Sequence, residues 1–437
     1  MIIKIILPFG LFILSLYGCT SQKYITGDRK IKQLILESTL TNEHFIGINV
    51  WDAENQTTIV SCQSDNLFTP ASNTKLLTFL ITDKILKDSL PTLRYCIQND
   101  SLYFSGMGDP TFLHPKFQPQ KAFEFISKFQ GNLVFVPQKM EDQRFGPGWA
   151  WDDYPYYFQP EKGTFPIYGN CIWITKDSIE DTYSITPKGF DVNVFPSDDT
   201  LFKSRIIRPE FSNEFELKYS KQKDRLEVEI PFLTSDSMAL KLLEDTLERK
   251  VHMGAMPANC DIKYLHNFPK DSLFKRLLVD SDNLFAEQLL LSSSFQQLGM
   301  FDSDSLIKYS MHTFFPDWQQ KIKWKDGSGL SRYNLMSPDF IMEVLRRIYK
   351  YNSWERIAHL FPDGGTEGTL KNILKSDVAF VHAKSGSMTG VYNLSGFIKA
   401  DSGNILLFSI MNNNFNKPVK EIRKEVEKIV LFLKSEY

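Results

Sequence analysis

The chain has 437 residues, of which 42% are hydrophobic and 14% are aromatic, and its formal net charge at pH 7 is −2. This length and apolar content are enough for two or three packed domains and exclude a disordered chain. The nearly balanced charge gives no sign of a nucleic-acid partner.

The first 18 residues predict an export signal, because Lys4 supplies a positive charge and an apolar run covers residues 5–17. That run is shorter than the roughly 20 residues that a membrane helix needs. Leu16–Cys19 resembles a bacterial lipobox, so we expect residues 1–18 to be removed and Cys19 to be lipidated. The mature protein would then be periplasmic and anchored to a bacterial membrane. The alternative is an ordinary cleaved signal in which Cys19 is incidental.

The next elements predicted are a helix from Ile31 to Leu40 and a hairpin of two strands, His44 to Trp51 and Thr57 to Cys62. The sequence Thr-Pro-Ala-Ser-Asn-Thr-Lys follows, with Ser72 and Lys75 at the head of an apolar helix. Residues three apart share a helix face, so Lys75 is placed to take the proton of Ser72, whose hydroxyl is a poor nucleophile without a base.

Neither this Ser-x-x-Lys motif nor the Ser-Asp-Asn motif at residues 281–283 is specific alone. The Ser-x-x-Lys spacing recurs at Ser220, Ser272 and Ser305, and a second Ser-Asp-Asn begins at Ser64. Ser72 differs in its context, since a predicted strand precedes it and an apolar helix follows it.

Residues 90–265 are strand-like and aromatic, and they separate Ser72 from Ser281 by far more chain than a loop needs. This length predicts one or more β-rich accessory domains, inserted into a unit formed by residues 19–89 and 266–437. The aromatic run from Trp149 to Tyr168 is expected to lie in a core or between domains.

Four cysteines remain besides Cys19, and an oxidising compartment allows them one or two disulfides. They are Cys62, Cys96, Cys171 and Cys260. Four cysteines allow three full pairings, which the sequence leaves open. The seven histidines lack metal-ligand spacing, so no metal site is expected.

Two further polar motifs follow the insertion. Ser281-Asp282-Asn283 lies between two helical patterns, and Lys384-Ser385-Gly386 ends a strand predicted from Val378. Strands at residues 391–400 and 405–412 and a closing amphipathic helix, Val419 to Ser435, complete the pattern. With the N-terminal hairpin, these segments predict an α+β unit with a five-stranded antiparallel sheet that is packed by the terminal helices.

The ordered triple of Ser-x-x-Lys, Ser-x-Asn and Lys-Ser-Gly resembles the signature of penicillin-binding proteins and serine β-lactamases. Other stretches resemble one branch, the D-alanyl-D-alanine carboxypeptidase/endopeptidase family, or class C low-molecular-mass penicillin-binding proteins. These stretches are Gly108–Thr111, Gly148–Asp153, Asp326–Arg332, Gly368–Leu370 and Lys384–Val391. The resemblance implies a penicillin-recognising, β-lactamase-like fold with a helical subdomain.

The resemblance also implies the roles of the site residues. Ser72 would be acylated with Lys75 as its base, Ser281 would relay a proton, and Asn283 would bind the substrate backbone and Lys75. Asp282 would fix the turn. Lys384, Ser385, Gly386 and Ser387 would bind substrate, with a carboxylate docked on Lys384 and Ser385 and an oxyanion held by the N–H groups of Ser72 and Ser387. Burial and the second lysine would favour a neutral Lys75.

The function expected is that of a serine DD-peptidase. It would hydrolyse D-alanyl-D-alanine termini or cross-links of peptidoglycan, bind stem peptides and β-lactams, and need no cofactor. A β-lactamase or esterase would use the same acylation residues with faster deacylation. A catalytically silent lipoprotein that binds wall peptides is the other alternative.

Overall fold

The two ends of the chain form one antiparallel sheet of six strands. The computed structural model describes residues 25–38, 44–176, 183–198, 205–220 and 226–437, so the export signal and Cys19 lie outside the described residues. The strand order is β1 (Ile25–Gly27), β3 (Thr57–Cys62), β2 (Phe45–Asp52), β17 (Ile405–Asn413), β16 (Val391–Lys399) and β15 (Val381–Met388). The five predicted strands are confirmed, and β1 adds a three-residue edge strand that is too short to be recognised as a pattern.

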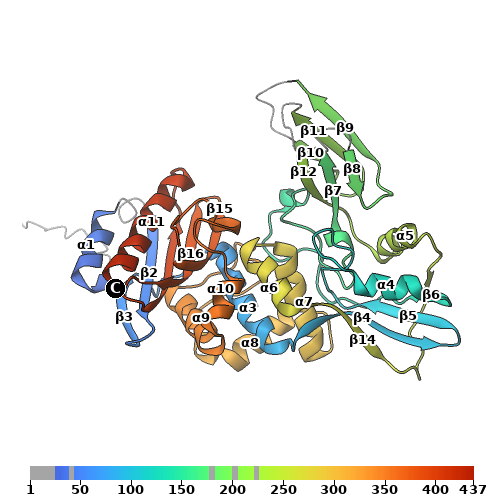
Figure 1. Cartoon of the computed structure of the whole chain (residues 1–437), viewed down its shortest axis with the longest axis horizontal. Helices are drawn as coiled ribbons and strands as arrows, with labels where there is room; N and C mark the ends of the chain where they lie inside the picture. Colours follow the sequence, from blue (N-terminus) through green and yellow to red (C-terminus); the bar gives the residue numbers. More distant parts are fainter. Residues whose placement is uncertain (1–24, 39–43, 177–182, 199–204, 221–225) are drawn as a thin grey trace, which may run out of the picture.

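The terminal helices cover one face of this sheet. They are α1 (Arg29–Glu37) and α11 (Val419–Glu436), seen side by side at the left of Figure 1. The apolar stripe of α11 is buried against the sheet, and it consists of Ile422, Val426, Ile429, Val430 and Leu433. In the described part of the chain, no helix is long and apolar enough to cross a bilayer.

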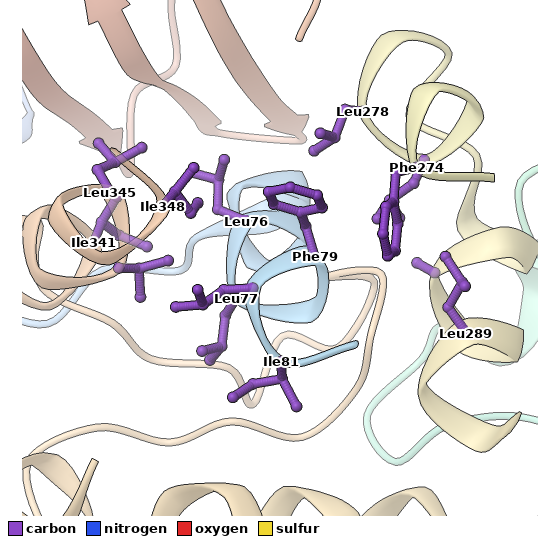
Figure 2. Close-up of a cluster of buried hydrophobic side chains, with 14 of the residues drawn as sticks. Leu76, Leu77, Phe79, Ile81, Phe274, Leu278, Leu289, Ile341, Leu345 and Ile348 are labelled. Atoms are coloured by element: carbon purple, nitrogen blue, oxygen red, sulfur yellow. The ribbon is translucent and has the colours of Figure 1, made fainter. Parts of the chain in front are cut away.

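A helical layer covers the other face of the sheet. Its helices are α3 (Thr74–Ile85), α6 (Lys270–Val279), α7 (Asn283–Leu298), α8 (Ser303–Phe314), α9 (Pro338–Tyr351) and α10 (Trp354–Leu360). Residues 74–82 of α3 are all buried, because this helix is apolar on every side and lies at the centre of the layer. Figure 2 shows Phe79 of α3 pointing towards Phe274 and Leu278, with Leu76 facing Ile348 of α9.

The segment between β4 (Ser89–Gln98) and β14 (Lys263–Pro269) folds separately, at the right of Figure 1. One lobe is a mixed sheet in the order β13 (His252–Met253), β6 (Asn132–Phe135), β5 (Ser101–Gly106), β4 and β14, with α4 (Lys121–Lys128) and α5 (Asp236–Leu247). The other holds two three-stranded sheets. The first is β12 (Leu226–Pro231), β7 (Cys171–Lys176) and β8 (Tyr183–Thr186), and the second is β10 (Arg205–Ile207), β11 (Phe215–Ser220) and β9 (Val192–Ser197).

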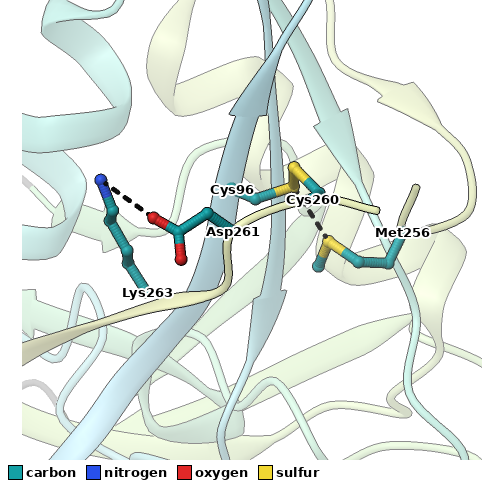
Figure 3. The surroundings of a disulfide bond; sticks show 5 residues. All are labelled: Cys96, Met256, Cys260, Asp261 and Lys263. Carbon is teal, nitrogen blue, oxygen red and sulfur yellow. Dashed lines mark hydrogen bonds and ion pairs between the residues drawn. A yellow bond between two sulfur atoms is a disulfide. The ribbon is translucent and has the colours of Figure 1, made fainter. Parts of the chain in front are cut away.

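One disulfide joins the two ends of this insertion. Cys96 of β4 is bonded to Cys260, which precedes β14, and their Cα atoms are 6.0 Å apart (Figure 3). Cys62 and Cys171 are both buried, and burial raises the pKa of the Cys171 thiol well above its usual range. The structure thus contains one disulfide of the one or two that were expected, and its partners are Cys96 and Cys260.

Phe79 gives a direct test of the helical core. Its ring lies edge-on to Phe274, at 5.0 Å between ring centroids, and is 1% exposed. Phe79→Ala is expected to lower the free energy of unfolding by about 3–5 kcal/mol, because it leaves a cavity in this layer. Urea denaturation measures the change. The exposed Phe45→Ala is the control, with an expected change within about 0.5 kcal/mol; similar losses in both variants would contradict this account of the core.

Candidate active site

A tight turn at the head of α3 presents Ser72. A 3-10 turn, η1 (Ala71–Asn73), runs directly into α3, so Ser72 and Lys75 lie on the same side of the chain. The side-chain amide of Asn393 on β16 donates to the carbonyls of Thr69 and Pro70, at 2.9 and 2.8 Å, and holds the turn against the sheet. The sequence prediction that Ser72 begins this helix is therefore confirmed.

Two glycines allow other segments to approach this turn. A Cβ atom on Gly386 of β15 would lie 2.6 Å from the carbonyl oxygen of Pro70 and 3.0 Å from the backbone nitrogen of Ser72. Gly329 has φ +86°, and a Cβ atom there would lie 1.9 Å from the carbonyl oxygen of Ala71. Any side chain at either position would push β15 or the residue 326–331 loop away from Ser72.

Lys75 is fully buried and its ammonium nitrogen has three polar neighbours. Nζ lies 2.6 Å from Oδ1 of Asn283, 2.7 Å from the carbonyl oxygen of Ser328 and 3.1 Å from Oγ of Ser72. Two of these neighbours are carbonyl oxygens, which only accept hydrogen bonds, so both must face an N–H of Lys75. In the neutral amine, two N–H groups are then used and the lone pair faces Ser72, the arrangement required of a general base.

Burial favours this neutral form. Desolvation lowers the pKa of Lys75 to about 8, against the negative charges of Asp326, Glu287 and Asp282, which oppose the shift. The pKa of Lys384 is lowered well below its usual range by burial and by the positive charge of Lys75. The second lysine was expected to favour a neutral Lys75, but the repulsion lowers the pKa of Lys384 instead, and the pKa of Lys75 is lowered by burial.

The Ser281–Asn283 turn connects α6 to α7. Asp282 caps α7 by accepting from the Phe285 N–H and also accepts from the guanidinium of Arg276, at 2.9 Å, so it fixes the turn as expected. The Asn283 amide nitrogen donates to the carbonyl of Phe158, at 2.8 Å, which leaves its Oδ1 facing Lys75. Ser281 lines the cleft beside Ser72, without a hydrogen bond to Ser72 or Lys75 among the described residues.

The Lys384–Ser387 segment lies in the middle of β15, which continues to Met388 rather than ending at residue 384. Ser385 and Ser387 line the cleft. Lys384 does not, because its side chain is fully buried and its Nζ donates to the carbonyl of Ser385, at 2.9 Å. The structure thus brings Lys384 to the site as a buried amine behind the cleft wall, where burial disfavours its charged form.

The cleft has a volume of about 790 Å³ and is lined by residues from both the peptidase unit and the insertion. Ser72 lies at η1, Ser281–Asn283 on one side and Ser385–Ser387 on the other. The insertion contributes Lys116, Tyr157, Phe158 and Glu229. Among the described residues, no group of three or more His, Cys, Asp or Glu side chains could hold a metal ion.

Sequence analysis assigned no role to the loop of residues 326–331, which supplies the Ser328 carbonyl. Asp326 organises this loop by accepting from the backbone N–H groups of Gly329 and Ser331, the amide of Asn334 and the indole of Trp149. Glu287 of α7 accepts from the Ser328 N–H, at 2.7 Å, and burial beside Asp326 raises the pKa of Glu287. The Asp-Gly-Ser-Gly sequence was a turn signal that could have marked this loop.

The prediction that the aromatic run lies in a core or between domains, rather than on a surface that contacts sugar or peptide, is wrong for part of it. Phe165 and Tyr168 belong to the insertion core, whereas Trp151 is 75% exposed. Tyr157 is also exposed, and it lines the cleft with Phe158. The run is divided because its first half follows the cleft mouth, where side chains meet solvent or a bound molecule rather than a core.

Comparisons with known proteins agree over most of the chain. The family model described as D-Ala-D-Ala carboxypeptidase 3 (S13) family matches residues 28–434. The chain is 25% identical over 349 residues to D-alanyl-D-alanine carboxypeptidase DacB of Haemophilus influenzae, with 71% of each protein covered. It is 24% identical over 436 residues to a D-alanyl-D-alanine carboxypeptidase of Actinomadura sp., covering 88% of this chain and 80% of the relative. The crystal structure of penicillin binding protein 4 from Haemophilus influenzae matches with a TM-score of 0.72 at 20% identity, over 93% of this chain and 100% of that one.

The buried lysine predicts a distinct pH dependence. Because only neutral Lys75 can accept the Ser72 proton, the rate of Ser72 acylation is expected to rise with pH and to reach half its maximum near pH 8. Asn283→Asp would place a carboxylate beside Nζ, stabilise the ammonium and move the midpoint to higher pH. The acylation rate with a fluorescent penicillin, measured across this range, gives both midpoints. Thermal unfolding at each pH is the control, and an unshifted or lowered midpoint in the variant would contradict the base assignment.

Proposed function

Because the chain belongs to the D-Ala-D-Ala carboxypeptidase 3 (S13) family and is a serine DD-peptidase, we propose that it acts through an acyl-enzyme at Ser72. The observation that supports this assignment best is the contact between Lys75 and Ser72, at 3.1 Å, with both other Lys75 neighbours being carbonyl oxygens. Ser72 is the hydroxyl that faces the lone pair of a neutral, buried amine. No other catalytic base is needed for its activation.

The proposed reaction has two steps. In acylation, Oγ of Ser72 bonds to the carbonyl carbon of the penultimate D-alanine while its proton passes to Lys75. The N–H groups of Ser72 and Ser387 stabilise the oxyanion, and the proton reaches the leaving amine through Ser281 as the C–N bond breaks. In deacylation, a water molecule gives a proton to Lys75 as its oxygen bonds to the ester carbon. The bond from that carbon to Oγ of Ser72 then breaks, Oγ takes the proton back from Lys75, and the peptide leaves as a free acid.

We propose that the substrates are peptidoglycan stem peptides ending in D-Ala-D-Ala and D-alanyl cross-links, and that β-lactams acylate the same serine. All three carry a carboxylate next to the bond that is attacked. Ser385, Gly386 and Ser387 would hold this region of the substrate along β15, with the two hydroxyls as donors to the carboxylate. Lys384 would act from behind the wall by holding the carbonyl of Ser385, since burial separates it from the cleft and disfavours its charged form.

Membrane attachment is also a proposal. We propose that residues 1–18 are a signal peptide, that Cys19 is lipidated, and that the periplasmic protein combines a peptidase unit, residues 19–89 and 266–437, with an insertion, residues 90–265. The lipobox-like Leu16–Cys19 sequence supports this. A second signal besides one acyl chain is needed for stable anchoring, and a lipobox cysteine would carry several chains.

Substitution of the nucleophile tests the proposed activity. Ser72→Ala is expected to abolish labelling by fluorescent penicillin and all peptide release, because Ser72 is the only hydroxyl hydrogen-bonded to Lys75 in the described part of the chain. Purified sacculi are digested and the fragments identified by mass spectrometry, where free D-alanine indicates trimming and monomers from dimers indicate cross-link cleavage. Ser305→Ala, which removes the serine of a matching Ser-x-x-Lys on α8, is the control. Labelling that persists in Ser72→Ala, or is lost in Ser305→Ala, would refute the assignment, and rapid penicillin turnover with little D-alanine release would favour a β-lactamase.

The anchor has a separate test. Expression in a Gram-negative host with globomycin, which blocks lipoprotein processing, is expected to leave the signal attached, whereas untreated cells yield an acylated N-terminus at Cys19. Mass measurement of the purified N-terminus distinguishes the two forms. Cys19→Ser is the matched variant and should be released from membranes. An unmodified N-terminus at any position in untreated cells would end the lipoprotein proposal.

A further inference from the structure

The two serines of β15 face away from Lys384. Side chains on a strand alternate between its faces, so Ser385 and Ser387 share a face with Ala383, while Lys384 and Gly386 point the other way. Ala383 packs in the core formed with α11, and Gly386 packs against the Ser72 turn. The hydroxyls of Ser385 and Ser387 therefore lie on the α11 side of the sheet, and the Lys384 ammonium lies on the other side.

A second cation occupies the serine side. Arg423 belongs to α11 and lines the cleft together with Ser385, Ser387 and Thr389. Its guanidinium carbon lies 5.2 Å from the ring centre of Tyr392, which is directly opposite Ser387 in the register of β15 and β16. Cross-strand partners project from the same face of a sheet. Arg423 is thus placed at the strand end that carries the two hydroxyls.

The environment of Arg423 is that of an incompletely satisfied cation. Its Nε is buried and has no hydrogen-bond partner within the described chain. Of the other cations that line the cleft, Arg332 is exposed and interacts with Asp153, and two more are engaged on the opposite wall. Lys116 pairs with Glu229 at 3.0 Å, and Arg276 pairs with Asp282 at 2.9 Å. The guanidinium interacts with the Tyr392 side chain and lines the cleft with Ser385 and Ser387, so its other N–H groups are donors that suit a carboxylate.

We propose that Arg423 is a specificity-determining residue that binds the carboxylate of the substrate together with Ser385 and Ser387. This inference rests on the proposed function, and it names the cation that contacts the substrate. A guanidinium binds a carboxylate through two parallel hydrogen bonds, which an isolated buried ammonium behind the wall cannot supply. Lys384 acts on the site from behind the wall through its hydrogen bond to the Ser385 carbonyl, whereas Arg423 touches the ligand.

The test compares two ligands that differ only in the carboxylate. Second-order rate constants for acylation of Ser72 are measured with benzylpenicillin and with its methyl ester, in the wild type and in Arg423→Ala. The variant is expected to react about 10- to 100-fold more slowly with the acid, because it lacks a charge-assisted hydrogen bond to the carboxylate. The loss should appear in the constant for penicillin binding and not in the rate of the acylation step. The variant's rate with the ester should not change. Arg423→Lys should recover part of the loss, because it keeps the charge but not the paired donors.

Lys424→Ala is the matched control, since Lys424 is the exposed neighbour on the same helix. It should leave both rates unchanged. Equal losses on acid and ester in Arg423→Ala, or no loss on the acid, would overturn the proposal. Thermal unfolding of each variant is the folding control. If the unfolding midpoint of Arg423→Ala falls, an equal loss is attributed to misfolding and the comparison is repeated with Arg423→Gln. Release of D-alanine by the wild type is measured separately. If it is absent while Arg423→Ala still slows acylation by the acid and leaves acylation by the ester unchanged, the DD-peptidase proposal fails and the role of Arg423 stands.

Discussion

The site depends on how the amine of Lys75 is surrounded. Its two carbonyl neighbours come from Asn283 and Ser328, which belong to different segments, and neither oxygen can donate a proton. Together they determine which direction the lone pair of the neutral amine takes, and that direction is towards Ser72. The chemistry therefore depends on placing two acceptors correctly more than on the spacing of Ser72 and Lys75, which Ser272 and Lys275 share on α6 and Ser305 and Lys308 share on α8.

Burial of two lysines in one place would be costly without compensation. Charge on Lys75 is disfavoured by desolvation and supported by Asp326, Glu287 and Asp282, whereas charge on Lys384 is disfavoured by both desolvation and Lys75. Two of these carboxylates also hold the backbone that contacts Lys75, because Asp326 organises the loop and Glu287 accepts from the Ser328 N–H. The same groups thus fix the geometry of the base and limit how far its pKa falls, which keeps its titration near neutral pH instead of far below it.

The strands of the terminal sheet, the helix at Ser72 and the three polar motifs were predictable, since each depends on local pattern: alternation, apolar spacing and short motifs in order. The sequence did not predict which side of β15 Lys384 faces, or that the Lys384 side chain is completely buried. Both facts follow from which sheet face meets α11 and which meets the helical layer, a property of the packed chain. The roles of Asp326 and Arg423 were missed for the same reason, because each depends on contacts with residues that are distant in sequence. The pairing of Cys96 with Cys260 likewise needed the register of the insertion.

The insertion is physically part of the site. The carbonyl of Phe158 accepts from the Asn283 amide, and the indole of Trp149 donates to Asp326, so one segment of the insertion holds both supports of Lys75. Arg208, farther along the insertion, donates to the carbonyl of Tyr154 and stacks on its ring, which ties that segment to the accessory lobe. Without this segment, the Asn283 amide would lose the acceptor that orients it, and its oxygen and nitrogen could exchange places. The amide nitrogen would then face the lone pair of Lys75 and compete with Ser72 for it, so the insertion determines the basicity available to the nucleophile.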